Sequence, residues 1–282
     1  MVQPPSEATV QRDVDRALQE DIGGGDASAM LLPDDRQHAH VLCREAAVIA
    51  GRPWFDACFR QLDPQVQVQW HVAEGDRVGP DTVLCSLYGR GRALVSGERA
   101  ALNFLQTLSA TATATAAFAD ALAGTRTHVL DTRKTLPGLR EAQKYAVRAG
   151  GGMNHRMGLY DAVMIKENHV IAAGSISAAI AASRRLHPGL PLIVEVEDLA
   201  ELEEALAGAP DRILLDEFGP DEMHEAVRRV AGRVPLEVSG SVTLETIGAV
   251  AATGVDFVSV GALTKHVRAV DLSLRLGTRP AA

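Results

Sequence analysis

The sequence predicts an α/β protein in which an N-terminal α+β part precedes an incomplete barrel of βα units. From about residue 127 onward, six short apolar runs that end in polar or charged residues alternate with helical segments. Runs too short to be helices, separated by single helices, are typical of a parallel sheet. Six consecutive units favour a barrel over an open sheet, but a complete barrel has eight, so we expect an incomplete one.

The residues before 127 follow a different pattern, and they predict a separate domain. The chain opens with a short amphipathic helix, and the later stretch VQVQWHV alternates as a half-buried strand does. A long helical stretch rich in Ala and Thr then leads into the barrel. In chain order the expected elements are a helix within 1–26, a strand within 38–51, a helix over 51–62, a strand over 66–72, a turn and strand over 73–89, and the long helix over 96–124.

The barrel is expected from six apolar runs and the helical segments between them. Several of these segments end in Gly or Pro, as helices commonly do. The runs are HVLDTRK, DAVMIKENH, LIVEVED, RILLDEF, PLEVSGS and FVSVGAL. The helical segments are 139–152, 175–189, 199–209, 220–232 and 243–254.

The domain boundary is expected inside the long helix. We assign residues 1–112 to the N-terminal domain and residues 113–264 to the barrel, which carries the active site. Residues 265–282 are expected to form a C-terminal helix that can pack back on the N-terminal domain.

Composition limits the possible partners. The 282 residues carry a formal charge of -8 and a pI near 5.6, so a nucleic-acid or membrane-surface partner is not expected. Three widely spaced cysteines indicate neither a disulfide framework nor a Cys-x-x-Cys pair, which fits a reducing cytoplasm. The N-terminal residues contain no apolar core of a signal peptide, and no run is long enough to span a membrane.

Charged and small residues follow every expected barrel strand. Loops that follow barrel strands converge on one pocket, so these residues are expected to meet there, however far apart they lie in sequence. The pattern therefore predicts a polar pocket with several cations. The residues are Asp131 to Lys134, Lys166 to His169, Glu195 to Glu197, Asp216 and Glu217, Ser239 to Ser241, and Gly261, together with His155 and Arg156 from the stretch GGGMNHRMG.

Several of these residues also have a structural interpretation. Asp131 and Asp216 would serve equally as N-caps of the helices that follow. Arg133 and Lys134 would suit a solvated loop, although two cations before a Pro-Gly turn favour a ligand. His169 is better explained as a structural histidine than as a catalyst. Either Glu195 or Glu197 could face the pocket, because residues two apart on a strand point the same way.

The residue types suit the binding of two polyanions. Small residues after the last two strands are typical of a phosphate site built from backbone N–H groups and a helix N-terminus. Arginine, lysine and histidine donate to carboxylates, and each charge-assisted bond contributes roughly 1.5–3 kcal/mol. Carboxylates opposite them suit sugar hydroxyls, Mg²⁺ or a developing cation. The phosphate group is Ser239, Gly240, Ser241 and Gly261, the cations are Arg133, Lys134, His155, Arg156 and Lys166, and the carboxylates are Glu195 and Asp216.

Two long motifs carry a resemblance to a known family. DTRKTLPGLR at 131–140 and GGGMNHRMGLYDAVMIKENH at 150–169 resemble quinolinate phosphoribosyltransferase, the carboxylating nicotinate-nucleotide pyrophosphorylase of NAD synthesis. Weaker similarities are EDIGGGDAS, SGERAALNFLQ, VEVE, LLDEF and EVSGSVTLE followed by VSVGALT, in order along nearly the whole chain.

The resemblance implies a fold, a reaction and an assembly. The implied fold is an N-terminal α/β sandwich with an incomplete C-terminal α/β barrel. The implied reaction joins quinolinate to 5-phosphoribosyl 1-pyrophosphate with Mg²⁺ and gives nicotinate mononucleotide, pyrophosphate and CO2. The implied assembly is a homodimer in which the sandwich of one subunit covers the barrel of the other.

The resemblance also implies roles for individual residues. Quinolinate would be held by Arg133, His155, Arg156 and Lys166, with Arg99 reaching the pocket from the partner subunit. Lys134, Glu195 and Asp216 would address the phosphoribosyl donor, with Mg²⁺ held at the two carboxylates directly or indirectly. Ser239 to Ser241 with Gly261 would hold the 5-phosphate.

Two positions depart from the family pattern. Members commonly have Gly where this chain has Ser241, and often Asn where it has Glu217. Serine adopts positive φ less readily than glycine, although its hydroxyl adds a donor. Glu217 adds negative charge near the expected metal and pyrophosphate.

Three other functions fit the sequence less well. A sister pyrophosphorylase of the same fold, such as a ModD-type protein, would not need the four residues Arg133, His155, Arg156 and Lys166 for two carboxylates. An aldolase needs a lysine in an apolar site, whereas Lys166 is flanked by Glu167 and other charges. A non-catalytic metabolite-binding module has no need of Glu195 and Asp216 opposite the cations.

Overall fold

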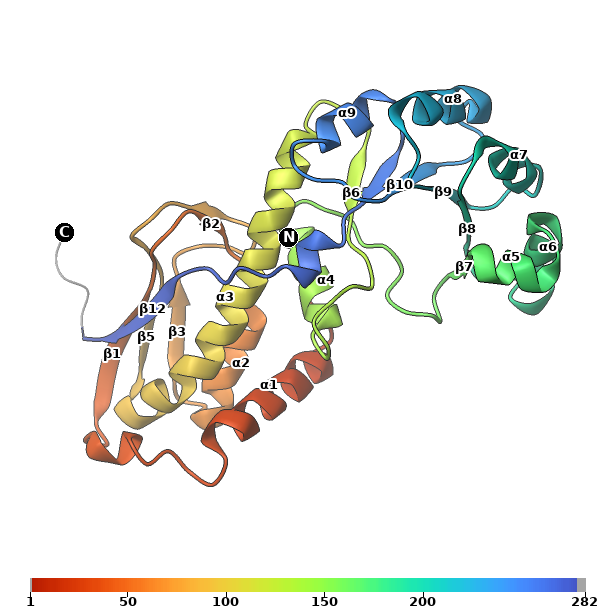
Figure 1. Cartoon of the computed structure of the whole chain (residues 1–282). Helices are drawn as coiled ribbons and strands as arrows, with labels where there is room; N and C mark the ends of the chain where they lie inside the picture. The colour runs from red at the N-terminus through yellow and green to blue at the C-terminus, as the bar shows by residue number, and fades with distance from the viewer. Residues whose placement is uncertain (1, 278–282) are drawn as a thin grey trace. The chain divides into compact units, whose positions relative to one another are not determined.

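The structure, a computed structural model, describes residues 2–277, which form two compact units. Within these residues the first unit comprises 2–116, 135–151 and 264–277, and the second comprises 117–134 and 152–263. Residues 135–151 thus group with the N-terminal residues, whereas the sequence suggested a single division after residue 112. Figure 1 labels the elements of each unit.

A four-stranded antiparallel sheet forms the β layer of the first unit, in the order β12-β1-β5-β3. In β3 the burial alternates between exposed and half-buried residues, as the sequence pattern predicts. A separate ribbon pairs β2 with β4. The strands are β1 (Arg36–Cys43), β2 (Ala47–Val48), β3 (Gln67–Trp70), β4 (Arg77–Val78), β5 (Thr82–Arg90) and β12 (Leu272–Leu276).

Helices form the second layer of this unit. Trp54, Phe55 and Phe59 of α2 are fully buried in one core with residues of α3 and of the sheet, and α2 and α3 run alongside the sheet (Figure 1). A sheet covered by helices confirms the predicted α/β sandwich. The helices are α1 (Glu7–Ile22), the short 3-10 helix Ala29–Leu31, α2 (Arg52–Leu62), α3 (Gly91–Ala121) and α4 (Arg140–Ala149).

The helix expected at the C-terminus is wrong. Leu272–Leu276 form strand β12, which pairs antiparallel with β1 and sets Leu274 opposite Val41. The stretch LSLRL alternates apolar and polar residues, so a strand buries Leu272 and Leu274 together on one face, which a helix would not do. Residues 278–282 of the expected helix lie outside the described residues.

Six parallel strands form the sheet of the second unit, in the order β6-β11-β10-β9-β8-β7. Each of the six apolar runs contains one of them, so the predicted βα repeat is confirmed. The order leaves β6 and β7 at opposite edges, and the barrel is therefore open, as predicted. The strands are β6 (His128–Leu130), β7 (Val163–Ile165), β8 (Leu192–Val196), β9 (Arg212–Asp216), β10 (Leu236–Ser239) and β11 (Phe257–Ser259).

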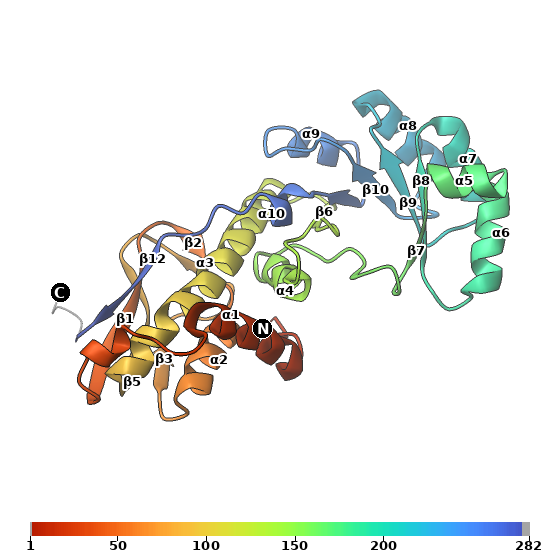
Figure 2. The ribbon, with the colours of Figure 1, turned by 60° about the horizontal axis from the view of Figure 1, so that its bottom comes forward.

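The helices of this unit cover the outer face of its sheet. Val194, Ile213 and Val238 of the strands are buried in one core with residues of α6, α7 and α8, and these helices lie along the strands in both views (Figures 1 and 2). Met153 forms an isolated parallel β-bridge with Leu130 of β6. The chain after α4 therefore partly covers this edge of the sheet. The helices are α5 (Glu167–Ala173), α6 (Ile176–Leu186), α7 (Leu199–Ala207), α8 (Pro220–Val230), α9 (Ile247–Ala252) and α10 (Ala262–Lys265), the last of which begins in the second unit.

Two further observations concern the chain as a whole. Among residues 2–277 no helix is long and apolar enough to cross a lipid bilayer. Cys43, Cys58 and Cys85 are all buried free thiols, and burial raises the pKa of Cys58 to about 12. The prediction of no disulfide framework therefore holds for the described residues.

Candidate active site

One cavity of the second unit gathers most of the predicted site residues. It has a volume of about 190 Å³ and lies at the carboxyl ends of the barrel strands. The following predicted residues line it: Arg133, Lys134, His155, Arg156, Lys166, Glu195 and Ser239. Residues more than 100 positions apart thus meet because parallel strands end at the same rim.

Two arginines, Arg133 and Arg156, line this cavity. The Arg156 side chain is held by the carbonyl oxygen of Ala162, 3.2 Å from Nη1, and by the sulfur of Met164, 3.6 Å from Nη2. Burial lowers the pKa of Arg156, and the nearby charge of Arg133 lowers it further. Two cations that repel each other at a cavity wall form a site whose electrostatic energy falls when an anion binds.

A salt bridge joins two neighbouring strands at the rim. The Lys166 ammonium, which follows β7, donates to the Glu195 carboxylate on β8. The Glu195 side chain is only 12% exposed, whereas the Lys166 side chain is 45% exposed. Glu195 is therefore the carboxylate of this strand that lines the cavity. Glu197 lies beyond the end of β8, where it is exposed and its N–H donates to Glu201.

Asp131 is a buried anchor for the residues that carry the cations. It is fully buried, its Oδ2 accepts from the amide of Asn154 at 2.5 Å, and its Oδ1 accepts from the N–H of His155 at 2.9 Å. Helix α4 is not capped by it, because the cap position there is Leu139. The alternative that Asp131 is an N-cap is therefore wrong. Asp216 is no N-cap either, since Gly219 precedes α8.

Glu237 is a further residue of this site, and no motif of the sequence predicted it. This carboxylate lines the same cavity, is fully buried, and lies between Arg212, 2.8 Å from Oε2, and His155, 3.4 Å from Oε1. Burial alone would raise the pKa of Glu237, but His155 and Arg212 together lower it. The only signal in the sequence was an acidic residue inside the apolar run PLEVS.

The expected phosphate-binding residues lie at neighbouring strand ends. Ser239 and Asp216 are register partners at the ends of β10 and β9. Gly240 follows with φ +143°, and a Cβ there would lie 3.2 Å from Glu217 Oε2, so this turn requires glycine. Ser241 is exposed beyond it. The structure thus places Ser239, Gly240 and Asp216 next to one another.

Gly261 brings Lys134 to the same rim. It follows β11, and α10 begins directly after it. A Cβ at position 261 would lie 2.9 Å from Cδ of Lys134, so the lysine stem passes directly over this glycine. Lys134, from the loop after β6, therefore shares the rim with the residues that follow β11.

Two expectations concern residues outside the cavity. Arg99 is exposed on α3 in the first unit, and its contribution from a partner subunit stays a prediction. His169 Nδ1 accepts from the backbone N–H of Lys166 at 3.1 Å, and it thereby satisfies the first turn of α5. This contact agrees with the structural interpretation of His169.

The rim on this side is acidic as well as basic. Among residues 2–277 no group of three or more His, Cys, Asp or Glu side chains could by itself enclose a metal ion. However, desolvation raises the pKa of Glu197, and the nearby charges of Glu167, Glu201, Asp216 and Glu195 raise it further. Carboxylates that repel one another favour a bound cation, which here would need oxygen ligands from elsewhere.

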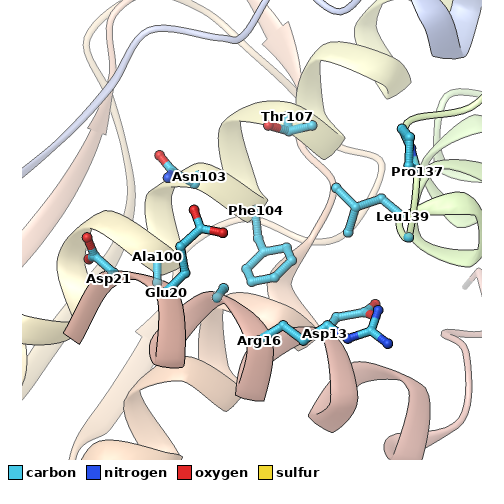
Figure 3. A pocket seen from close by; sticks show the side chains of 12 residues that line it. Asp13, Arg16, Glu20, Asp21, Ala100, Asn103, Phe104, Thr107, Pro137 and Leu139 are labelled. Carbon is cyan, nitrogen blue, oxygen red and sulfur yellow. The ribbon is translucent and has the colours of Figure 1, made fainter. Parts of the chain in front are cut away.

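A different pocket lies in the first unit, between α1, α3 and the residues before α4 (Figure 3). Phe104 points into it, and Glu20 and Asn103 lie on its walls (Figure 3). Its ionisable residues are Asp13, Arg16, Glu20 and Asp21, with three acids to one base. This charge balance does not suit a polyanion, so the cavity of the second unit is the candidate active site.

The fold and the cavity together define a class of protein. An open parallel α/β barrel whose strand ends present clustered cations, a glycine turn and two carboxylates is typical of enzymes that handle phosphorylated, anionic substrates. Comparison with known proteins then gives the family. Residues 26–109 match the N-terminal domain of quinolinate phosphoribosyl transferase, and residues 111–275 match its C-terminal domain. The chain belongs to this family.

Individual relatives match nearly the full chain. A probable carboxylating nicotinate-nucleotide pyrophosphorylase of Synechocystis is 44% identical over 265 residues, 92% of this chain and 90% of the relative. Its counterpart in Bacillus subtilis is 40% identical over 257 residues, 90% of this chain and 89% of the relative. The nicotinate-nucleotide pyrophosphorylase structure from Francisella tularensis superposes with a TM-score of 0.94 at 41% identity, covering 98% of this chain and 99% of that one.

Proposed function

We propose that this chain transfers the phosphoribosyl group of 5-phosphoribosyl 1-pyrophosphate to quinolinate in NAD biosynthesis. The products are nicotinate mononucleotide, pyrophosphate and CO2. The observation that carries the proposal is the single cavity in which Arg133, Arg156 and Lys166 lie beside Lys134 and Glu195. Its cations match two adjacent carboxylates, and its rim provides a separate place for phosphate groups.

We propose that quinolinate binds at the two guanidinium groups. Arg133 and Arg156 repel each other in the absence of an anion, and two adjacent carboxylates would neutralise both through paired hydrogen bonds. Lys166 would contact the same ligand while it keeps its bond to Glu195. His155 completes the predicted quinolinate group. Lys166 would thus link the pyridine side of the cavity to the ribose side.

The phosphoribosyl donor would occupy the adjoining rim. Lys134 would neutralise the pyrophosphate, and the turn Ser239 to Ser241 with Gly261 would hold the 5-phosphate through backbone N–H groups. Glu195 and Asp216, which end β8 and β9, would accept hydrogen bonds from the ribose hydroxyls. This arrangement would set C1 of the ribose next to the pyridine nitrogen.

Mg²⁺ is proposed as the cofactor. The acidic rim around Glu195, Glu197 and Asp216 fits a hard cation, because carboxylate oxygens are ligands that Mg²⁺ prefers. Glu195 and Asp216 would hold the ion, with pyrophosphate and water oxygens as the further ligands. When bound, it would supply charge neutralisation to the leaving pyrophosphate.

The chemistry follows from this arrangement. As the bond between C1 and pyrophosphate breaks, positive charge develops on the ribose ring, where Glu195 and Asp216 stabilise it. The pyridine nitrogen forms the new bond to C1 and becomes a pyridinium. The adjacent carboxylate then leaves as CO2, its bonding electrons remain on the ring carbon beside the positively charged nitrogen, which stabilises them, and a proton from water takes the place of CO2 on that carbon. The protein therefore mainly positions and desolvates the substrates, and no dedicated general base is required.

Quinolinate binding tests this assignment without turnover. Quinolinate should raise the melting temperature of the protein, because a ligand bound only by the folded state stabilises it. Nicotinate, which lacks the second carboxylate, should raise it much less at the same concentration. Equal shifts from the two ligands would contradict a site built for two carboxylates.

A homodimer with a shared site is also proposed. Arg99 is exposed on α3, where a partner cavity could receive it. The Arg99→Ala and Arg156→Ala proteins should each be nearly inactive. When they are mixed and allowed to exchange subunits, a hybrid carries one intact site, so about a quarter of wild-type activity should return at equal amounts by random pairing. No recovery, with exchange verified by mass spectrometry, would exclude a shared site.

Glu217→Asn is expected to improve both stability and donor binding. Glu217 has φ +54°, which costs a non-glycine residue about 1 kcal/mol or more and which asparagine tolerates better. The change also removes a negative charge beside Gly240. The melting temperature should rise and the KM for the phosphoribosyl donor should fall.

A matched control separates the two effects. Ala231→Gly relieves a similar conformation, φ +48°, at the end of α8. It should raise the melting temperature and leave the KM for the donor unchanged. If Glu217→Asn behaves in the same way as this control, the negative charge has no influence on the donor.

We propose a cytoplasmic location. Three buried free thiols agree with a reducing compartment, since thiols there are kept reduced. Fractionation of the source cells with an antibody against the protein tests the location.

A further inference from the structure

Glu237 is a buried carboxylate that contributes to no step of the reaction above. It lies in β10 between Leu236 and Val238 and is fully buried. A buried carboxylate costs several kcal/mol unless it is paired and hydrogen-bonded. Its position two residues before Ser239 puts it on the same face of the strand, the face that lines the cavity.

Arg212 holds one oxygen of this carboxylate from the amino-terminal side of the barrel. Its Nη1 donates to Glu237 Oε2 at 2.8 Å. The Arg212 guanidinium also stacks over the ring of Phe257, 4.3 Å from its centroid, and Phe257 is the register partner of Glu237 on β11. The guanidinium is therefore fixed by an ion pair and by an aromatic face, so Glu237 Oε1 has a defined direction.

That direction points at His155. The Nε2 of His155 lies 3.4 Å from Glu237 Oε1, and its Nδ1 accepts from the backbone N–H of Arg156 at 2.7 Å. Because Nδ1 accepts a hydrogen bond, it carries no proton, and the ring proton lies on Nε2. The ring therefore connects the Glu237 carboxylate to the backbone of Arg156.

A second hollow lies on the far side of His155 and Arg156. His155 and Arg156 line the active-site cavity and also a second hollow of about 390 Å³, whose walls include Pro191 and Asp211 near the amino ends of β8 and β9. Packing against these two residues is therefore incomplete on the side away from the active-site cavity. The Glu237 carboxylate provides an anchor on that side, because its Oε1 lies within ion-pair distance of His155 Nε2.

We propose that Glu237 is a positioning residue for quinolinate: it holds His155 as the Nε2–H tautomer and thereby sets the backbone from which Arg156 reaches the substrate. Glu237 itself touches no substrate. The expected effect on the KM for quinolinate rests on the proposed role of Arg156. The expected tautomer of His155 does not rest on that role.

The tautomer is measured directly in the unliganded protein. Two-dimensional ¹⁵N–¹H spectra of histidine-labelled protein, assigned with a His155→Gln variant, should show an unprotonated Nδ1 and a protonated Nε2 for His155. This measurement needs no altered Glu237. Protonation on Nδ1, or on both nitrogens at neutral pH, would overturn the proposal.

Glu237→Gln tests the anchor, because an amide cannot replace both bonds. With its oxygen toward Arg212, its NH₂ group faces the Nε2–H of His155, and with the amide reversed, its NH₂ group faces Arg212. In either orientation an N–H donor of the glutamine faces another N–H donor, and no hydrogen bond forms between them. We expect the His155 spectrum to change and the KM for quinolinate to rise about tenfold or more, with the KM for the phosphoribosyl donor changed less than about twofold.

A control separates positioning from a general loss of stability. Glu74→Gln removes the charge of another largely buried carboxylate, which accepts from the N–H groups of Gly51 and Arg52 in the first unit. It should lower the melting temperature and leave the KM for quinolinate unchanged. If Glu237→Gln leaves the KM unchanged as well, Glu237 has only a structural role. If the wild-type protein converts no quinolinate, the proposed function fails, and the spectrum still decides the tautomer.

Discussion

Arg156→Ala is expected to lower kcat/KM for quinolinate about a thousandfold. The guanidinium lies at the cavity wall, held by Ala162 and Met164 and repelled by Arg133. Its removal takes away two charge-assisted hydrogen bonds to the substrate, each of about 1.5–3 kcal/mol. This free energy corresponds to a decrease of roughly a thousandfold in kcat/KM. Steady-state kinetics with each substrate varied in turn measures the effect.

The loss should be specific for the pyridine substrate. Arg156→Lys keeps the charge but not the planar fork, so it should recover only part of the activity. Arg184→Ala, an exposed arginine of α6 in the same unit, should leave both KM values unchanged. If Arg156→Ala raised the KM for the phosphoribosyl donor and not that for quinolinate, Arg156 would belong to the other half of the site.

Asp131→Ala is expected to destabilise the second unit by about 2–4 kcal/mol, because it removes the acceptor of one buried and one half-buried donor. Those donors are the Asn154 amide and the His155 N–H. Urea unfolding, followed by a fluorescent label placed in the second unit, measures the loss. Activity should fall at temperatures where the protein is still folded, because the same residues carry His155 and Arg156 to the cavity.

A substitution at a helix N-cap is the control for Asp131→Ala. Ser175→Ala removes the hydroxyl that accepts from Ala178 N–H at the start of α6 and should cost about 1 kcal/mol. A loss of that size for Asp131→Ala would mean that Asp131 contributes no more than one local hydrogen bond. A larger loss supports its role as the anchor of the residues 154–156.

Much of the fold was predictable because it follows from local patterns. Each strand of the parallel sheet is predicted from a short apolar run, since most of the residues in these strands are buried, and each run ends where the strand reaches the rim. The charged residues near the ends of these strands, such as Arg133, Lys166 and Glu195, were therefore recognisable before any contact was known. Parallel strands bring their carboxyl ends together, and this geometry alone predicts one shared pocket.

The remainder depends on contacts between distant residues. Strand β12 pairs with β1 more than 200 residues earlier, and its five residues were too few to reveal their period. Asp131 was ambiguous because a cap and a buried anchor use the same residue type. Glu237 interrupts the apolar run PLEVS and Arg212 begins the run RILLDEF, and only the pairing of β9 with β10 shows that the two residues neutralise each other.

The assay of the complete reaction tests the central claim most directly. Purified protein is incubated with quinolinate labelled in the departing carboxylate, phosphoribosyl pyrophosphate and Mg²⁺, and nicotinate mononucleotide and released CO2 are quantified together. The account predicts equal amounts of the two products, with little nucleotide formed when nicotinate replaces quinolinate. No nucleotide, or equally rapid formation from nicotinate, would contradict it.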